Sequence, residues 1–320
     1  MPLDKDSSEQ IGLVVKTHSG FFTVQTPTQL ITCQLRGSLK QASKKTELCV
    51  IGDRVQVELT EDSTTVQRGV ITAILPRERV LSRVEPSAYA GKAGEREQVM
   101  IANLDQAVFV FSTTTPTPNP RTLDRFLIAA EKAAIPSIII VANKIDLATD
   151  EVRAMFDIYA QIGYTVMYVS ARNQTGTDEL RHALTDHISI FTGPSGVGKS
   201  SLLNVIQPGL GQAVGAVSQK LTKGKHTTVN AELIPLEAGG YVADTPGIRT
   251  LSPWDVEPME LDAYYPEFRP YISACSFSDC THFDEPGCAV RAAVERGEIS
   301  EMRYDSYQRV REQLEEEYVY

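Results

Sequence analysis

The sequence predicts a multidomain α/β protein with a small β-barrel, a parallel α/β domain and a mostly helical module, in that order. Three observations support this prediction. Short alternating apolar runs fill the first 75 residues, wholly apolar runs alternate with helical segments after residue 100, and three cysteines and a histidine cluster near the C-terminus. A chain of 320 residues can hold several domains, because single cores usually stop growing at about 250–300 residues.

The composition restricts the class of protein. The longest apolar run, at 135–142, is far shorter than the roughly 20 residues of a membrane span, and the chain starts without the features of a signal peptide. The net charge is −10, and residues 251–320, with 16 acidic and 6 basic side chains, hold the whole excess. We therefore expect a cytoplasmic protein with no membrane partner, which can still carry a basic patch elsewhere. We also expect it to be a monomer in solution. Cys33 and Cys49 are expected to be buried or otherwise unreactive thiols.

Residues 1–10 are a polar leader, and residues 11–75 predict a barrel of the oligonucleotide-binding (OB) type. Five short alternating runs, at 12–15, 21–24, 30–35, 54–59 and 69–74, are separated by glycine and polar residues. This number of strands matches an OB barrel, although the pattern hardly separates it from any other small β domain. Phe21 and Phe22 could stack on bases, but we expect one of this adjacent pair to point into the core.

Residues 76–98 are predicted to be a linker or surface loop. They contain five clustered cations, Arg77, Arg79, Arg83, Lys92 and Arg96. Such a cluster can follow the phosphates of a nucleic acid, and a solvated connector explains it equally well.

Residues 99–250 predict a parallel α/β domain. Apolar runs at 107–111, 138–141 and 165–169 alternate with helical segments at 122–134 and 151–162. Runs in which nearly every residue is apolar indicate strands that are covered on both faces.

The motif Asn143-Lys144-Ile145-Asp146 follows one of these strands and predicts a guanine site. Asp146 can accept hydrogen bonds from the N1–H and the 2-amino group of guanine, a pair of donors that adenine lacks. Asn143 would contact the base edge, and Lys144 would pack along the purine. One strand later, Ser170 and Ala171 fit a loop whose backbone amide meets the guanine oxygen.

A G-x-x-x-x-G-K-S motif predicts a phosphate loop between a strand at 188–192 and a helix at 201–206. Unpaired N–H groups and the helix dipole favour negative charge at a helix N-terminus. Lys199 would contact the β- and γ-phosphates, and Ser200 would bind Mg²⁺. The residues expected at the phosphates are Gly193, Pro194, Ser195, Gly196, Val197, Gly198, Lys199, Ser200 and Ser201.

Two further segments predict GTPase switches. Thr227 or Thr228 can bind Mg²⁺ and the γ-phosphate, and we assign Thr228, with Lys199, a part in catalysis. Asp244 and Gly247 are the fixed positions of a D-x-x-G motif, in which the aspartate holds Mg²⁺ through water. An isolated D-T-P-G would be an ordinary turn, but this one follows a strand.

The base motifs precede the phosphate motifs, which reverses the order of an ordinary small GTPase. Cutting such a domain after its second switch and joining its old ends through residues 177–187 gives the order found here. The sequence therefore predicts a circularly permuted P-loop GTPase domain over 99–250. The second switch then continues directly into the C-terminal module, so that loss of the γ-phosphate can move this module.

Residues 251–320 predict a mostly helical module with a structural zinc site. Cys275, Cys280, His282 and Cys288 offer three thiolates and one imidazole, which suit tetrahedral Zn²⁺. Four protein ligands leave no open position, and a catalytic zinc would need one.

The last helical segment, at 300–318, has an apolar and an acidic side. Four apolar residues at roughly helical spacing are expected to be core or docking contacts, namely Met302, Tyr307, Val310 and Leu314. The glutamates are expected to form a solvated face, namely Glu312, Glu315, Glu316 and Glu317.

With these motifs the sequence resembles the circularly permuted GTPases of small-ribosomal-subunit biogenesis, the RsgA (YjeQ) family. The likeness extends from Ile11 to the C-terminal helix. It implies a cytoplasmic factor that binds the small subunit and its rRNA late in maturation. Such a factor hydrolyses GTP to GDP and phosphate faster on that particle and is then released. One structural Zn²⁺, and Mg²⁺ with GTP or GDP, would be its cofactors.

The catalytic residue is a separate question. Ras-like proteins place a glutamine that orients water just after D-x-x-G, whereas Ile248 stands here, so slow intrinsic hydrolysis is expected. We hypothesise that His226, in the first switch, acts when the ribosomal particle orders that loop. The alternative is a solvent-facing loop histidine.

Two rival functions stay open. One is a nucleotide-gated RNA- or DNA-binding module in which hydrolysis is incidental, and its GTP and GDP forms would bind the small subunit differently, or it would prefer unrelated nucleic acid. The other is a zinc-stabilised scaffold with a vestigial nucleotide site. The presence of Lys199, Ser200, Asp146 and Asp244 argues against the scaffold.

Overall fold

The computed structural model describes residues 9–42, 49–60, 67–84, 97–219, 231–244 and 256–318. The chain divides into two compact units, each made of separate stretches of sequence. The first unit comprises Met1–Gln106, Thr177–Phe191 and Lys199–Arg249, and the second comprises Ala107–Gly176, Thr192–Gly198 and Thr250–Tyr320. Each unit therefore combines part of the α/β domain with one flanking domain. Among the described helices, none is long and apolar enough to cross a membrane.

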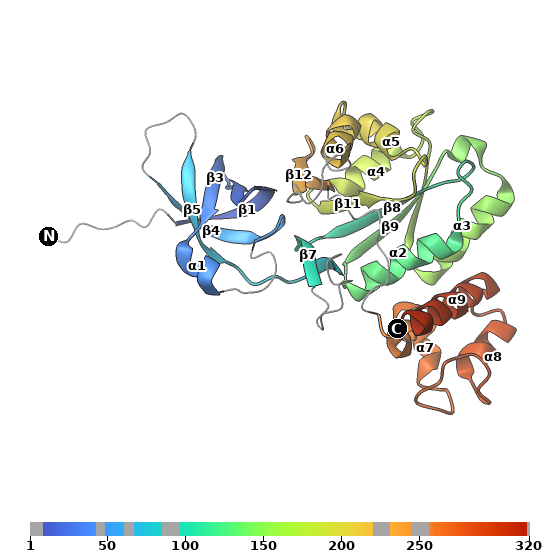
Figure 1. Cartoon of the computed structure of the whole chain (residues 1–320). Coiled ribbons are helices and arrows are strands. Elements are labelled where there is room, and N and C mark those ends of the chain that lie inside the picture. Colours follow the sequence, from blue (N-terminus) through green and yellow to red (C-terminus); the bar gives the residue numbers. More distant parts are fainter. Residues whose placement is uncertain are drawn as a thin grey trace. The chain divides into compact units, whose positions relative to one another are not determined.

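The N-terminal domain is a five-stranded barrel, as predicted (Figure 1). Its strands are β1 (Glu9–His18), β2 (Phe21–Gln25), β3 (Leu30–Leu35), β4 (Arg54–Leu59) and β5 (Arg68–Ile74), with helix α1 (Gly37–Ala42) after β3. The pairings β1–β2, β2–β3, β3–β5, β5–β4 and β4–β1 close the sheet on itself.

Alternate side chains of these strands fill the barrel. Cys33 and Cys49 are buried in its core, as predicted, and burial raises the pKa of Cys33 to about 12. Phe22 is 8% exposed and packs in the core, whereas Phe21 is 47% exposed. The expected division of this aromatic pair is confirmed.

The segment expected to be a linker contains regular structure. Strand β6 (Val80–Val84) pairs antiparallel with β7 (Glu97–Ala102), so an irregular connector is the wrong description for residues 80–84. The dense charge of this region concealed the short alternating run Val80-Leu81-Ser82-Arg83-Val84, whose Leu81 is 4% exposed. Residues 85–96, including Lys92 and Arg96, lie outside the described residues.

Two of the clustered cations are held by internal contacts. Arg77 donates two hydrogen bonds to the buried carboxylate of Asp53, at 2.7 and 2.8 Å. Arg79 donates to the Leu104 carbonyl at 3.1 Å. Nearby, Asn103 donates to the Gly52 carbonyl at 2.9 Å and accepts from the Glu78 N–H at 2.9 Å. We call Asp53, Arg77 and Asn103 the N-terminal joint, because they tie the barrel to the β6–β7 hairpin.

Gly52 is required at this joint. Its φ is +84°, and a Cβ atom there would lie 1.9 Å from the carbonyl oxygen of Ala102. Any side chain would therefore separate the barrel from the end of β7.

The first unit also contains the C-terminal part of the α/β domain. Its elements are α4 (Thr177–Leu184), β11 (Ile188–Thr192), α5 (Lys199–Ile206), α6 (Leu210–Gln219), β12 (Ala231–Pro235) and β13 (Tyr241–Asp244). β11 and β13 are parallel, β12 is antiparallel to β13, and barrel strand β1 pairs antiparallel with β12. Arg181 of α4 donates to the carbonyls of Val205 and Ile206 at the end of α5.

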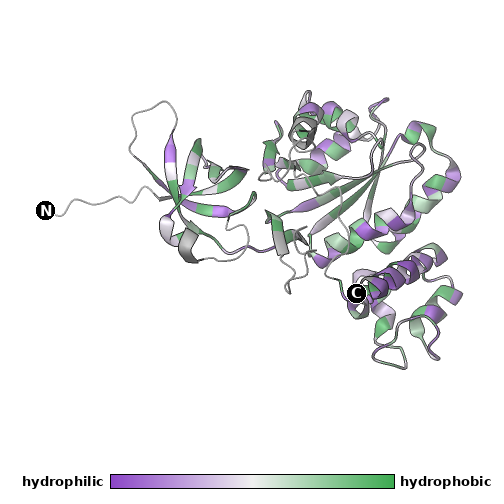
Figure 2. Cartoon of the chain, in the orientation of Figure 1, coloured by the Kyte–Doolittle hydropathy of each residue, from purple (hydrophilic) through white to green (hydrophobic). Residues whose placement is uncertain are grey.

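The second unit contains the N-terminal part of the α/β domain. Its elements are β8 (Gln106–Ser112), α2 (Pro120–Lys132), β9 (Ser137–Asn143), η2 (Ile145–Leu147), α3 (Asp150–Ile162) and β10 (Thr165–Val169). The strand order is β10-β9-β8, and β9 and β10 are parallel. Every residue of β8 is buried, as its apolar run predicts, and Phe109 packs on Phe126 of α2. Figure 2 shows the apolar colour along these strands.

The C-terminal module packs against α2 in the same unit. It contains η4 (Pro258–Tyr264), α7 (Arg269–Ile272), α8 (Ala289–Glu295) and α9 (Glu301–Tyr318). Tyr307, Val310 and Leu314 lie in its buried core with Ile128 of α2, so their predicted packing role is confirmed. Glu312, Glu315 and Glu316 are exposed, as predicted.

Helix α9 also buries charge, which the sequence did not reveal. Figure 2 shows it as almost wholly hydrophilic, yet Arg303 is 1% exposed. Its guanidinium contacts carboxylate oxygens of Asp124 on α2 and of Glu267, the latter at 2.6 Å. We call Asp124, Glu267 and Arg303 the C-terminal joint.

Candidate functional site

The guanine motif stands where β9 ends, and Asn143 connects it to two loops. Asn143 is 1% exposed. Its side-chain amide donates to the Val197 carbonyl at 2.9 Å, and its side-chain oxygen accepts from the Ala171 N–H at 3.3 Å. The structure thus brings together the guanine motif, the Ser170-Ala171 loop and the phosphate loop, which are far apart in sequence.

Asp146 lies on the 3₁₀ turn η2 with its carboxylate oriented by Ser170. The buried Ser170 hydroxyl donates to one oxygen of Asp146 at 2.7 Å and accepts from the Asn173 N–H at 3.1 Å. Asp146 itself is exposed, so a ligand can reach its carboxylate. This arrangement suits an acceptor for the two neighbouring donors of guanine.

Lys144 precedes this turn in the left-handed conformation, with φ of +67°. Its ammonium group donates to the carbonyls of Thr115 and Gly196, the latter at 3.0 Å. These contacts extend the aliphatic part of the side chain between two loops, where it can cover one face of a base.

The phosphate loop depends on glycine at two close approaches. Gly193 has φ of +150°, and a Cβ atom there would lie 2.1 Å from the carbonyl oxygen of Val110. Gly198 has φ of +96°, and its Cβ would lie 2.5 Å from the side-chain nitrogen of Asn143. A side chain at Gly193 would therefore clash with strand β8, and one at Gly198 would clash with the guanine motif.

The remaining loop residues follow the predicted order into helix α5. Pro194, Ser195 and Gly196 are partly or fully exposed, and Val197 is buried. Lys199, Ser200 and Ser201 form the first turn of α5, which is the helix N-terminus that the motif requires.

Other predicted positions lie outside the described residues. These are His226, Thr227, Thr228, Gly247 and Ile248. Asp244 is the last residue of β13, in the strand predicted for it, and only its backbone is described.

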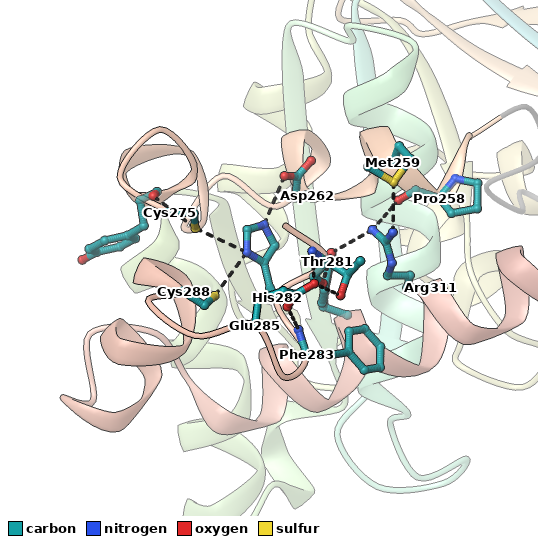
Figure 3. Close-up of polar contacts among 12 residues, drawn as sticks. Pro258, Met259, Asp262, Cys275, Thr281, His282, Phe283, Glu285, Cys288 and Arg311 are labelled. Carbon is teal, nitrogen blue, oxygen red and sulfur yellow. Dashed lines mark hydrogen bonds and ion pairs between the residues drawn. The ribbon is translucent and has the colours of Figure 1, made fainter. Parts of the chain in front are cut away.

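The four predicted metal ligands come together in the C-terminal module. The three sulfurs and one ring nitrogen of Cys275, Cys280, His282 and Cys288 lie within 4.8 Å of one another. His282 turns its Nδ1 towards the sulfurs of Cys275 and Cys288, at 3.7 and 3.4 Å (Figure 3). Cys280, His282 and Cys288 are buried. Three thiols and an imidazole at these separations fit a tetrahedral site for a soft divalent ion.

Neighbouring residues hold this cluster in place. The Nε2 of His282 faces a carboxylate oxygen of Asp262 at 3.2 Å, which leaves Nδ1 as the metal-facing atom. His282 has φ of +64°, and its carbonyl accepts from the Tyr304 hydroxyl at 2.6 Å. The Tyr307 hydroxyl donates to the Thr281 carbonyl at 3.0 Å. Helix α9 therefore supports the cluster from one side.

Glu285 closes the loop between His282 and Cys288. Its carboxylate accepts from the Thr281 N–H at 2.7 Å and from the Phe283 N–H at 3.0 Å. Burial acts to raise the pKa of Glu285, but hydrogen bonds from the Thr281 hydroxyl and from the N–H groups of Thr281 and Phe283 outweigh it and lower the pKa to about 2. The anchor is thus ionised at neutral pH.

Sequence reasoning missed Asp262 and the buried residues that support the guanine motif. Asp262 precedes its histidine partner by 20 residues, and no spacing rule connects them. Ser112 and Thr113, at the end of β8, are 0% and 2% exposed. Two buried hydroxyls at the end of an apolar strand were the available signal.

Two family models match the chain, one over the barrel and one over the α/β domain. A family model described as RsgA GTPase matches residues 74–254, and one described as RsgA N-terminal domain matches residues 11–66. A protein of Gemmatimonas aurantiaca named small ribosomal subunit biogenesis GTPase RsgA is 42% identical over 305 residues, covering 95% of this chain and 97% of that protein. A protein of the same name from Halalkalibacterium halodurans is 41% identical and covers 92% of this chain and 94% of that protein.

Two solved structures share the fold over almost the whole length. The crystal structure of YjeQ from Thermotoga maritima has a TM-score of 0.77 at 36% identity, covering 96% of this chain and 98% of that one. The crystal structure of YloQ, described as a circularly permuted GTPase, has a TM-score of 0.75 at 30% identity and covers 99% of both chains. These matches confirm the permuted domain that the motif order predicts.

Proposed function

The chain belongs to the RsgA family of GTPases, and we propose that it assists late maturation of the small ribosomal subunit. It binds the subunit and its rRNA in the cytoplasm as a monomer, hydrolyses GTP to GDP and phosphate faster on that particle, and is then released. The relatives named for small-subunit biogenesis support this proposal, because they match 92% or more of the chain. The domain limits 11–75, 99–250 and 251–320 are part of it.

The observation that carries the nucleotide site is the pair of hydrogen bonds made by Asn143. They join the motif that contains Asp146 to Val197 of the phosphate loop and to Ala171. A purine that meets Asp146 can then extend its phosphates towards the loop at 193–198. A guanine nucleotide satisfies both ends.

We assign roles to the motif residues accordingly. Asn143, Lys144, Asp146, Ser170 and Ala171 bind guanine, the loop from Gly193 to Ser201 binds the phosphates, and Lys199 binds the β- and γ-phosphates. Ser200, Thr228 and Asp244 would hold Mg²⁺, and Thr227 and Gly247 would bind the nucleotide. Bound Mg²⁺ would neutralise phosphate charge, while the backbone N–H groups and Lys199 orient the γ-phosphate for attack by water.

The Cys/His cluster is proposed to bind one structural Zn²⁺. The support is the donor set and the Asp262 contact, which fixes the ring of His282. Metal analysis of the purified protein tests it: Cys280→Ser should lose zinc that Cys33→Ser, a change of a buried barrel thiol, keeps.

Measurement of GTP turnover with and without purified small subunits tests the function. We expect a marked increase with small subunits and none with large subunits. Equal stimulation by both would contradict a role specific to the small subunit, and different binding by the GTP and GDP forms without turnover would favour a nucleotide-gated binding module.

Two variants separate binding from catalysis. His226→Ala should keep GTP affinity and lose most of the stimulated turnover, whereas Lys199→Ala should weaken GTP binding by removing a charge-assisted phosphate contact. Unchanged stimulated turnover in His226→Ala would reject the histidine as catalyst and leave the function standing.

A further inference from the structure

The short turn at residues 112–115, at the end of β8, holds the guanine motif through hydrogen bonds. Thr113 is 2% exposed, and its N–H donates to the Asn143 carbonyl at 2.8 Å. Its hydroxyl donates to the Lys144 carbonyl, also at 2.8 Å. Thr113 therefore contacts the backbone of two consecutive motif residues.

The Lys144 carbonyl is the point at which the Asp146 turn is fixed. It also accepts from the Leu147 N–H at 2.9 Å, the hydrogen bond that closes the 3₁₀ turn around Asp146. Lys144 has φ of +67°, a conformation that costs a residue with a side chain some free energy. The Thr113 hydroxyl thus fixes the Lys144 carbonyl. This carbonyl belongs to the residue in the left-handed conformation, and it also closes the turn around Asp146.

The same turn places the Lys144 side chain. The Ser112 hydroxyl is buried, accepts from the Thr114 N–H at 3.1 Å and donates to the Thr115 carbonyl at 3.1 Å. That Thr115 carbonyl in turn accepts from the Lys144 ammonium group. Both the backbone and the side chain of the motif are therefore held by residues 112–115.

We propose that Thr113 is a positioning residue that sets the selectivity of this site for guanine through its hydroxyl group. Because it is buried, it acts through the turn from which Asp146 meets the N1–H and the 2-amino group of the base. The inference rests on the proposed role of Asp146 in binding guanine. Loss of the hydroxyl frees the Asp146 turn. Guanine has one donor for each carboxylate oxygen, so a misplaced carboxylate cannot meet both donors. We expect the hydrogen bond with the 2-amino group to weaken most.

The test compares binding of GDP with binding of inosine diphosphate, which lacks only the 2-amino group. Thr113→Val removes the hydroxyl and keeps the shape of the side chain, and Thr113→Ser keeps the hydroxyl. We expect Thr113→Val to weaken GDP binding about tenfold, as for a buried carbonyl that loses one of two donors. Its preference for GDP over inosine diphosphate should fall with it, while Thr113→Ser stays close to the unsubstituted protein.

A purely structural role would give a different result. A general loss of stability weakens both nucleotides equally, so an unchanged preference in Thr113→Val overturns the proposal, as does an equal loss in Thr113→Ser. If Thr113→Val does not fold, Thr113→Ala removes the same hydroxyl without crowding the site and is judged by the same ratio.

Asp146→Ala separates this inference from the proposed function. It should abolish most of the preference for GDP over inosine diphosphate. If Asp146→Ala lowers the preference for GDP over inosine diphosphate and Thr113→Val leaves it unchanged, the positioning role alone is wrong. If Asp146→Ala leaves the preference intact, the guanine site is wrong, and the role of Thr113 falls with it.

Discussion

The two flanking domains are held by buried carboxylates whose partners differ in their access to water. At the N-terminal joint, the side chain of Asp53 is 0% exposed, but that of its partner Arg77 is 23% exposed. At the C-terminal joint, the side chain of Arg303 is 1% exposed, and those of Asp124 and Glu267 are 0% and 8% exposed. Water can therefore reach the charges of the N-terminal joint if its ion pair is broken, but it cannot reach those of the C-terminal joint.

Aromatic rings account for much of this enclosure. The Arg303 guanidinium lies 4.4 Å from the ring centroid of Tyr265 and 5.4 Å from that of Tyr159. Burial acts to lower the pKa of Arg303, but Asp124 and Glu267 outweigh it and hold that pKa well above its usual value. The Arg303 side chain stays charged. It and its two carboxylate partners therefore each need the other to offset the cost of burying their charges.

Removal of Arg303 should therefore give the largest loss of stability. Arg303→Met leaves Asp124 and Glu267 buried without their cation, and breaking such a pair costs about 3–5 kcal/mol. Urea denaturation, followed by hydrogen exchange along α2 and α9, would locate the loss at the C-terminal joint.

The matched control for this variant is Arg309→Met on the same helix. The Arg309 side chain is 52% exposed and pairs with Asp305, whose side chain is 51% exposed, so its loss should cost well under about 1 kcal/mol. Similar effects of the two substitutions would mean that burial does not distinguish them.

Removal of Arg77 should give an intermediate loss. Arg77→Met takes two hydrogen bonds from Asp53, which keeps the Val50 N–H at 2.8 Å. We expect the free energy of unfolding to fall by about 2 kcal/mol. The hydrogen bonds to the charged Asp53 are lost, but water can take the place of the partly exposed Arg77 side chain. Thermal unfolding of the barrel measures this, and Arg36→Met, which breaks an exposed pair with Glu58, is its control.

The difference between the joints also shows what sequence reasoning can reach. The barrel strands, the apolar strands of the α/β domain and the grouping of the three cysteines with His282 were predicted, because alternation, apolar runs and fixed spacings are local signals. Of the motif residues that the structure describes, Asn143, Asp146 and Ser170 lie as the local strand pattern required. Their link to the phosphate loop is the hydrogen bond from the Asn143 side chain to the Val197 carbonyl.

Contacts between distant charges had no such signal. Arg303 shares the helical stripe of Tyr307, Val310 and Leu314, but its charge suggested solvent, since its partner Asp124 is 179 residues away. The short strand β6 was hidden for a related reason, because the cations of its region resemble a solvated connector. A buried charge can be recognised only once its counter-charge is placed beside it.

The smallest loss should come from the ion pair between Lys16 of barrel strand β1 and Glu232 of β12. The two groups are 2.7 Å apart, but their side chains are 43% and 31% exposed, so Lys16→Met should cost less than about 1 kcal/mol in urea denaturation. The backbone pairing of the two strands, with Lys16 opposite Glu232, does not depend on the charges. If Lys16→Met cost as much as Arg77→Met, access to water would not set the strength of these attachments. A small effect would place the three pairs in the order of their burial.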